Sequence, residues 1–350
     1  MERRGASPGE RASAEWIAAR LREAGAEDVR VRPFRYQHTY AWAHIAHFAA
    51  GMLGSRLLAA AAAVSLDAEF SGRSQWVRRL LPAGTGWNVV ARVPAAGAPR
   101  RTVVLVAHHD AEHTGLMWHP RVVAAARGRS FATIPFLGLA LAALGLHRPA
   151  RLLLGCSILM SLDVARGATV PGASDNATGV AAVLALVERY AREPLPGTEL
   201  VALFPGCEES GMGGMAAWLR EEGAALDPQT TLVLGLDTLG AGEPVLVAGE
   251  GPPRTVRYRE ADLALVDRAA DRAGLPRPRR ARIGGWTDPV LARFAGLPSV
   301  SLVSMRDGLF TNYHLPTDTP DRVDWGSVAR CLALARAVIE LPPEEAAVSA

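Results

Sequence analysis

The chain contains no lysine. All 38 of its basic residues are arginine, set against 35 acidic residues, for a formal net charge of +3. Alanine and glycine are also frequent, and this combined bias is typical of a GC-rich genome. The arginines are therefore expected to be scattered over the surface, and we predict no nucleic-acid partner.

Cysteine is scarce, and an apolar leader is missing. The three cysteines are Cys156, Cys207 and Cys331, and no CxxC motif occurs. An odd number without that motif indicates neither a disulfide framework nor a cysteine zinc site. The first residues, MERRGASPGERASAEW, lack the apolar core of a secretory signal peptide. We therefore expect a cytoplasmic location, with membrane association left open by the apolar segments described below.

What the chain has is a large apolar fraction, 49% of 350 residues, with only 21% charged. This composition excludes global disorder. Apolar patterns alternate between strand and helix, which predicts a three-layer α/β/α fold around a central mixed, mostly parallel sheet. Helices are expected at 8–24, 176–190, 211–220, 261–273 and 325–339, and strands at 28–34, 87–93, 101–107, 199–204, 231–236 and 299–303.

Two strongly apolar stretches, 40–66 and 131–164, interrupt this alternation. A membrane-spanning helix needs about 20 apolar residues, and the second stretch is broken by a His-Arg-Pro sequence at 147–149. We predict two helical hairpins that pack together as an apolar subdomain. Residues 1–345 would then form one domain with helical inserts at about 37–86 and 131–164. Contact with a membrane surface, a soluble lid, a dimer surface and true spanning helices remain alternatives for the inserts.

Polar residues with catalytic potential follow the predicted strands. VLVAHHDAEH places His108 and Asp110 just after an apolar strand, and GASDNATGV places Asp175 before a helix. Taken singly, His108 could be a hydrogen-bonded structural residue and Asp175 a helix N-cap. The His-x-Asp spacing also suits a metal ligand whose second ring nitrogen is held by a carboxylate.

Three further segments carry candidate residues. LFPGCEESGMGG contains the adjacent Glu208 and Glu209, which repel each other unless a positive group lies beside them. Asp237 directly follows the apolar LVLGL, where a carboxylate needs a cap, a partner or a metal. TNYHLPTDTPD contains His314 in a predicted loop. Histidine and carboxylate donors at successive strand ends fit a catalytic zinc site better than a structural one.

The order HxD, GASDNATG, EESGMGG, an aspartate after a strand and NYHLPTDT resembles the co-catalytic zinc aminopeptidases of metallopeptidase family twenty-eight. Their relatives include glutamate carboxypeptidases and glutaminyl cyclases. The resemblance covers 8–36, 87–115 and 170–340, and it implies a single metallopeptidase domain. It also implies one shared carboxylate, two pairs of metal ligands, a general base and an orienting residue. These are Asp175 as the bridge, His108 with Asp237, Glu209 with His314, Glu208 as the base and Asp110 orienting His108.

The resemblance further implies a zinc-dependent exopeptidase, an aminopeptidase acting on peptides with a free N-terminus. Two zinc ions, or other divalent metals, would hold a bridging water that Glu208 deprotonates, and Tyr313 would offer a hydroxyl near the developing oxyanion. A glutaminyl-cyclase-like acyltransferase and an inactive membrane-associated binding module are the alternatives. The family's frequent SDH reads Thr287-Asp288-Pro289 here, which leaves the substrate preference open. The oligomeric state is not predicted.

Overall fold

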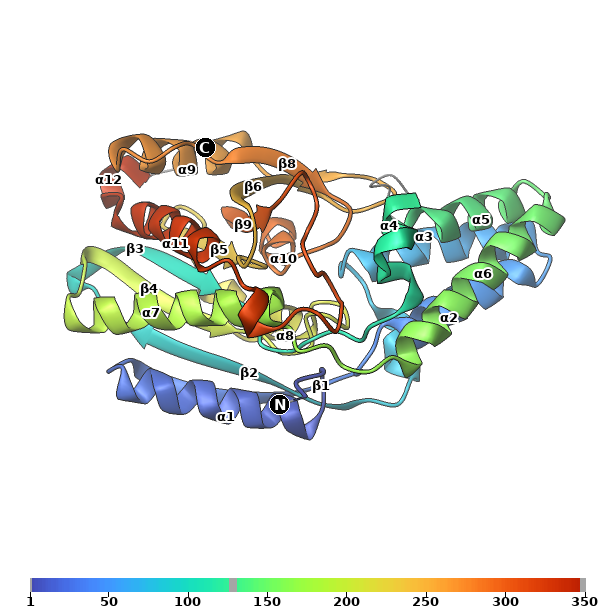
Figure 1. The fold of residues 1–350 in the computed structure, drawn as a ribbon, viewed down its shortest axis with the longest axis horizontal. Helices are drawn as coiled ribbons and strands as arrows, with labels where there is room; N and C mark the ends of the chain where they lie inside the picture. The colour runs from blue at the N-terminus through green and yellow to red at the C-terminus, as the bar shows by residue number, and fades with distance from the viewer. Residues whose placement is uncertain (1, 126–130, 347–350) are drawn as a thin grey trace.

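The computed structural model describes residues 2–125 and 131–346. Its centre is a mixed sheet of nine strands with helices on both faces (Figure 1). The four central strands, β4, β3, β5 and β9, are parallel, and antiparallel strands flank them on both sides. Along the sheet the order is β1 (Glu27–Tyr36), β2 (Gly84–Val93), β4 (Pro196–Phe204), β3 (Ala96–Val106), β5 (Thr231–Leu236), β9 (Ser299–Met305), β6 (Glu243–Glu250) and β7 (Val256–Arg257), with β8 (Arg279–Ile283) paired to β6.

Alternating side chains of β3 explain why the fold has three layers. Val103 and Leu105 belong to one apolar core, whereas Val104 and Val106 belong to another on the opposite face. Both faces of this strand are therefore covered. The first core is covered by α1 (Pro8–Glu23), α7 (Thr178–Arg192), α9 (Glu260–Arg272) and α11 (Trp325–Glu340), and the second by α8 (Gly213–Glu221) and α10 (Pro289–Phe294). The predicted α/β/α architecture is confirmed.

The region between β5 and β9 contains elements that the sequence patterns did not reveal. Strands β6, β7 and β8 and helix α10 all lie there. Strand β8 has the sequence RRARI, and it pairs only with β6, at the margin of the sheet. A strand exposed in this way needs no apolar alternation, so the periodicity that predicts half-buried strands was missing.

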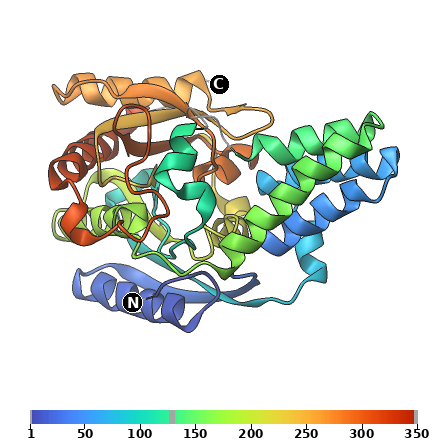
Figure 2. The ribbon, with the colours of Figure 1, turned by 45° about the vertical axis from the view of Figure 1, so that its right-hand side comes forward.

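The two apolar stretches form a bundle that extends from one side of the sheet (Figure 1). One hairpin consists of α2 (Ala41–Met52) and α3 (Arg56–Phe70), the other of α5 (Thr133–Ala143) and α6 (His147–Arg166). Figure 2 shows the hairpins side by side, with α2 against α6 and α3 against α5. This confirms the prediction of two packed hairpins.

The interior of the bundle is mainly apolar, although His44 and His47 of α2 are also buried. Leu66, Leu139 and Leu154 are fully buried there, together with Phe48 and Phe136. Within the two described ranges, no helix combines the length and the apolar composition that a bilayer crossing requires.

Candidate metal centre

The parallel centre of the sheet brings the candidate residues to one edge. His108 and Asp110 follow β3, Glu208 and Glu209 follow β4, and Asp237 follows β5. Because the carboxyl ends of adjacent parallel strands lie at the same edge, these side chains converge there. Loop residue His314, after β9, and Asp175, before α7, complete the group.

Asp175 lies between two histidines. Its Oδ1 is 3.2 Å from His108 Nε2, and its Oδ2 is 3.2 Å from His314 Nε2. Helix α7 begins at Thr178 with Ala177 as its N-cap, so Asp175 is not a capping residue. One oxygen of this carboxylate is thus directed at each imidazole.

The remaining candidate residues divide between the two histidines. Glu209 Oε2 lies 3.1 Å from His314 Nε2, and Asp237 Oδ1 lies 3.6 Å from His108 Nε2. Glu208 Oε2 is farther away, 4.0 Å from His108 Nε2. The structure therefore brings together all the residues that the sequence predicted at this site.

Asp110 contacts more than the histidine that it was predicted to orient. Its Oδ1 lies 3.5 Å from His108 Nδ1. Its shorter contacts are with the backbone: Oδ1 accepts the N–H of Glu208 at 3.0 Å, and Oδ2 accepts that of Glu209 at 3.2 Å. Asp110 therefore holds the turn that carries the two glutamates.

The electrostatics of the site call for positive charge. Burial raises the pKa of Glu208 well above its ordinary value, and burial together with Asp175 raises the pKa of Glu209 to about 8. Burial opposes protonation of His108, yet Glu208 and the other surrounding carboxylates outweigh it and raise the pKa of this imidazole. A cation among these groups would offset the repulsion between the carboxylates.

Several buried atoms of the site have no hydrogen-bond partner. His314 Nε2 is one, although two carboxylate oxygens lie 3.1–3.2 Å away, and Glu209 Oε1 and His108 Nδ1 are others. Unpaired buried polar groups are costly. A donor set of imidazole nitrogen and carboxylate oxygen is the one that catalytic zinc prefers. The residues present therefore fit a metal site.

Sequence reasoning missed two residues that position Asp175. Asp318 accepts the backbone N–H groups of Ser174 at 2.8 Å and of Asp175 at 3.1 Å, and burial raises its pKa to about 6. Asn176 donates to the carbonyl of Leu236 at 3.0 Å and is fully buried. Both residues lie within the motifs NYHLPTDT and GASDNATG, which could have revealed them.

The second glycine of GASDNATG, Gly179, lies where no side chain fits. A Cβ atom at Gly179 would collide with Asn176 Oδ1 and with the carbonyl oxygen of Leu236. Asn176 Oδ1 also accepts the N–H of Gly179 at 3.0 Å. The three-residue spacing of Asn176 and Gly179 therefore lets the turn after Asp175 pack closely against the end of β5.

The N-terminal segment forms hydrogen bonds with the loops that carry the site, a role that no motif indicated. The guanidinium of Arg3 donates to the carbonyls of His109, Pro171 and Gly172 at 2.9–3.1 Å, which ties the loop after β3 to the segment before Asp175. The buried Glu10 accepts the N–H of Cys207 at 2.7 Å. These contacts join residues more than 100 positions apart, beyond the reach of local patterns.

Aromatic rings flank His314. The ring of Tyr313 stacks on the imidazole with centroids 3.7 Å apart, and Trp118 meets it edge-on at 4.4 Å. The stacking fixes the orientation of His314. The proposed contribution of the Tyr313 hydroxyl stays a prediction.

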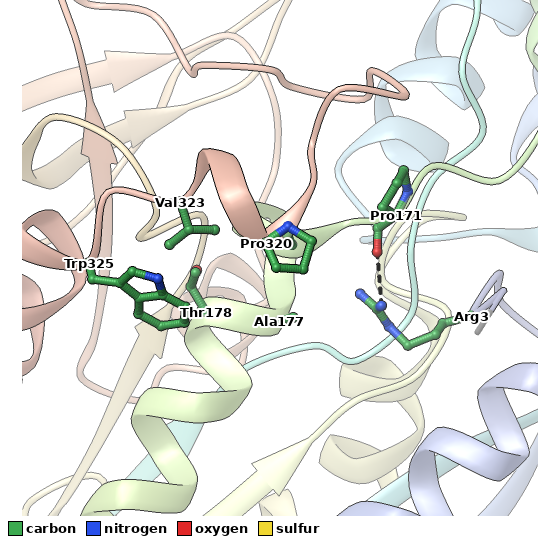
Figure 3. A pocket seen from close by; sticks show the side chains of 8 residues that line it. Arg3, Pro171, Ala177, Thr178, Pro320, Val323 and Trp325 are labelled. Carbon is green, nitrogen blue, oxygen red and sulfur yellow. Dashed lines mark hydrogen bonds between the residues drawn. The ribbon is translucent and has the colours of Figure 1, made fainter.

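An open cavity of about 360 Å³ lies beside the turn that contains Asp175 (Figure 3). Arg3, Pro171, Thr178 and Trp325 are among its lining residues, and Figure 3 shows Arg3 bonded to the carbonyl of Pro171. Its lining includes none of the candidate ligands. We therefore do not place the reaction there.

The chain is similar to a known protein family. The model of peptidase family M28 matches residues 88–339, a range that contains every candidate site residue. No curated protein sequence matches the chain significantly.

Solved structures share the fold. A zinc aminopeptidase from Bacillus subtilis has a TM-score of 0.58 at 14% identity, over 97% of this chain and 90% of that one. A Zn-dependent exopeptidase from Parabacteroides distasonis has a TM-score of 0.59 at 13% identity, over 97% of this chain and 93% of that one. The glutaminyl cyclase of Fimbriiglobus ruber has a TM-score of 0.58 at 13% identity, over 97% of this chain and 89% of that one. At these identities the likeness establishes the fold alone.

Proposed function

Because the chain belongs to peptidase family M28, we propose that it is a zinc-dependent exopeptidase, an aminopeptidase that acts on peptides with a free N-terminus. The observation that carries the proposal is the position of Asp175, whose two oxygens each lie 3.2 Å from a histidine nitrogen. A carboxylate directed at two imidazoles at once suits a bridge between two cations.

In this proposal Asp175 would hold both zinc ions. His108 and Asp237 would complete one position, and Glu209 and His314 would complete the other. Oxygen and imidazole donors would also accept other divalent metals. The negative charge of the site favours the cationic amino terminus of a peptide over a blocked one.

When bound, zinc ions polarise a scissile carbonyl and lower the pKa of water. Glu208 then takes the proton from the attacking water and delivers it to the leaving amine. Its carboxylate suits a proton carrier, since it lies farther from His108 Nε2 than the oxygens of Asp175 and Asp237 do. Asp110, by accepting the N–H of Glu208, keeps this carboxylate in place.

The test combines zinc content with kinetics. We expect about two zinc ions per chain and hydrolysis of aminoacyl but not of N-blocked substrates. Glu208→Gln is expected to lower kcat by roughly 10²–10⁴-fold with zinc content unchanged. Normal activity in this variant would contradict the role of Glu208, and cleavage of blocked substrates alone would contradict the aminopeptidase assignment.

A glutaminyl-cyclase-like acyltransferase is the second candidate. The observation that favours it is the equal TM-score, 0.58, of the cyclase from Fimbriiglobus ruber and the aminopeptidase from Bacillus subtilis. A peptide with N-terminal glutamine distinguishes the two: cyclisation with release of ammonia supports the cyclase, and release of free glutamine supports the peptidase. A zinc-loaded protein that does neither would fit an inactive binding module.

We also propose that the bundle contacts an anionic membrane surface. Segments 41–66 and 131–162 contain no Asp or Glu. The turns that join α2 to α3 and α5 to α6 lie at the end of the bundle far from the sheet (Figure 1). Leu57, in the first turn of α3, is 84% exposed, and Leu144, at the end of α5, is 68% exposed. Beside them, Arg56 and Arg151 link the hairpins by donating to the carbonyls of Ala143 and Met52, respectively. Exposed leucines combined with arginines favour anionic lipid headgroups.

Co-sedimentation with vesicles tests this contact. We expect binding to phosphatidylglycerol vesicles, weaker binding to phosphatidylcholine, and loss of binding in the double variant Leu57→Ser, Leu144→Ser. Concentration-dependent dimerisation without vesicle binding would instead identify the bundle as a surface between two copies. A protein that stays monomeric and does not bind vesicles would contradict both membrane contact and dimerisation.

A further inference from the structure

Glu112 is a buried carboxylate beside the metal centre that the five proposed ligands do not include. It lies in the loop after β3, two residues beyond Asp110, and is only 2% exposed. A carboxylate so deeply buried requires a partner.

The backbone next to Glu112 fixes its carboxylate. Oε1 accepts the N–H of His113 at 2.6 Å and lies 3.2 Å from the Nδ1 atom of the same residue. Both contacts are made by the adjacent residue, so they hold the carboxylate in one place. Neither contact is with an arginine, so neither brings it a permanent positive charge.

The carboxylate of Glu112 lies beside the second proposed metal position. A ligand atom of Glu112, one of Glu209 and one of His314 all lie within 4.8 Å of one another. His314 is 4% exposed; its Nδ1 has no hydrogen-bond partner, and its Nε2 faces carboxylate oxygens of Glu209 and Asp175 at 3.1 and 3.2 Å. Glu209 Oε1 is likewise buried and unpaired. These three side chains, two of which have buried atoms without a hydrogen-bond partner, could together bind a cation.

The donor distances suit one ion. Zinc binds carboxylate oxygen and imidazole nitrogen at about 2.0–2.2 Å, so two ligand atoms of one ion lie up to about 4 Å apart. Atoms within 4.8 Å reach this spacing by small side-chain movements. We infer that Glu112 is a further metal ligand, which binds the same ion as Glu209 and His314. This inference rests on the proposed zinc site and extends its ligand set by one residue.

The consequence is an asymmetric centre. With Glu112 included, the position near His314 has three carboxylates, from Asp175, Glu209 and Glu112. The position near His108 has two, from Asp175 and Asp237. The more anionic position is expected to bind its ion more tightly, and removal of Glu112 is expected to reduce or reverse this difference.

Zinc titration of the purified apo-protein tests the inference. In the wild type we expect two binding steps. Glu112→Gln is expected to weaken the step at the His314 position at least about tenfold and to leave the other step unchanged. The matched control is Glu243→Gln, since the Glu243 side chain is 74% exposed at the start of β6. This control is expected to bind zinc like the wild type.

A second variant gives a positive signal that does not depend on loss of binding. Glu112→Cys loaded with cobalt is expected to show a thiolate-to-cobalt charge-transfer band that the wild type, with its own three cysteines, lacks. Unchanged zinc affinity in Glu112→Gln together with no band in Glu112→Cys would overturn the inference. A higher KM in Glu112→Gln with unchanged zinc affinity would also overturn it, because Glu112 would then contact substrate. If the wild type binds no zinc at all, the proposed function itself fails.

Discussion

The candidate metal centre and the helical bundle both have buried interiors, but they are built in different ways. At the candidate centre, carboxylates and imidazoles from five separate loops meet, and carboxylates such as Asp110 and Asp318 accept N–H groups from distant backbone. In the bundle, neighbouring hairpins pack leucine and phenylalanine side chains, and many leucines remain exposed. The first structure depends on exact polar geometry, and the second on apolar volume. Damage to one should therefore leave the other intact.

The largest expected effect is in the bundle. Leu139 is fully buried in one cluster with Leu66 and Leu154, so Leu139→Ala leaves a cavity and is expected to lower the free energy of unfolding by about 2–5 kcal/mol. Urea denaturation measures this loss. Zinc affinity should be unchanged.

The matched control lies on the same helix. Leu137 is 55% exposed, and Leu137→Ala is expected to change stability by no more than about 0.5 kcal/mol. If Leu139→Ala weakens zinc binding as strongly as it destabilises the chain, the bundle and the candidate centre form one cooperative unit. They would then not be independent of each other.

A smaller effect is expected from a residue that positions a ligand. Asp318→Ala removes the acceptor of two N–H groups at Ser174 and Asp175, which frees the Asp175 carboxylate, the proposed bridge, to move. Zinc affinity is expected to fall about 10–100-fold, as measured by competition with a chelator. Asp321→Ala, at a fully exposed position three residues on, serves as the control. Equal affinities in both variants would show that the backbone holds Asp175 without Asp318.

The smallest effect concerns pH. Burial raises the pKa of Glu250 to about 7 from an ordinary 4.5, while Thr287 and Tyr258 donate hydrogen bonds to it. The folded state therefore retains a proton that the unfolded state loses, and the stabilisation is lost as the pH rises from about 4.5 to about 7. Glu250→Gln has no such proton to lose. Its Tm should therefore fall less than that of the wild type over this range, whereas parallel Tm profiles would refute the assignment.

The sequence predicted much of the fold because most elements carry strong local patterns. Strand β5 was predicted with its observed bounds, 231–236, and the two hairpins followed from apolar stretches interrupted by polar breaks. Strand β8 was missed because its RRARI sequence has no apolar alternation. Helix α7 was predicted to begin at 176, but the turn at Asp175 and Asn176 has non-helical backbone angles, and the helix begins at Thr178.

The candidate site was predictable to the extent that it lies in motifs. Its candidate ligands follow strands or precede a helix, where sequence patterns are clear. Arg3 and Glu10 could not be predicted, because they act on loops more than 100 residues away through backbone groups that leave no trace in a local pattern. Glu112 was overlooked since only the fold brings it close to His314.

We propose above that these side chains hold two cations, one on each side of Asp175. A crystal structure of the zinc-loaded protein, with anomalous difference maps at the zinc absorption edge, would locate the ions. We expect two zinc peaks, one beside His108 and Asp237 and one beside Glu209 and His314, with Asp175 contacting both. Zinc peaks that lie away from Asp175, or no peak among these side chains, would contradict this proposal.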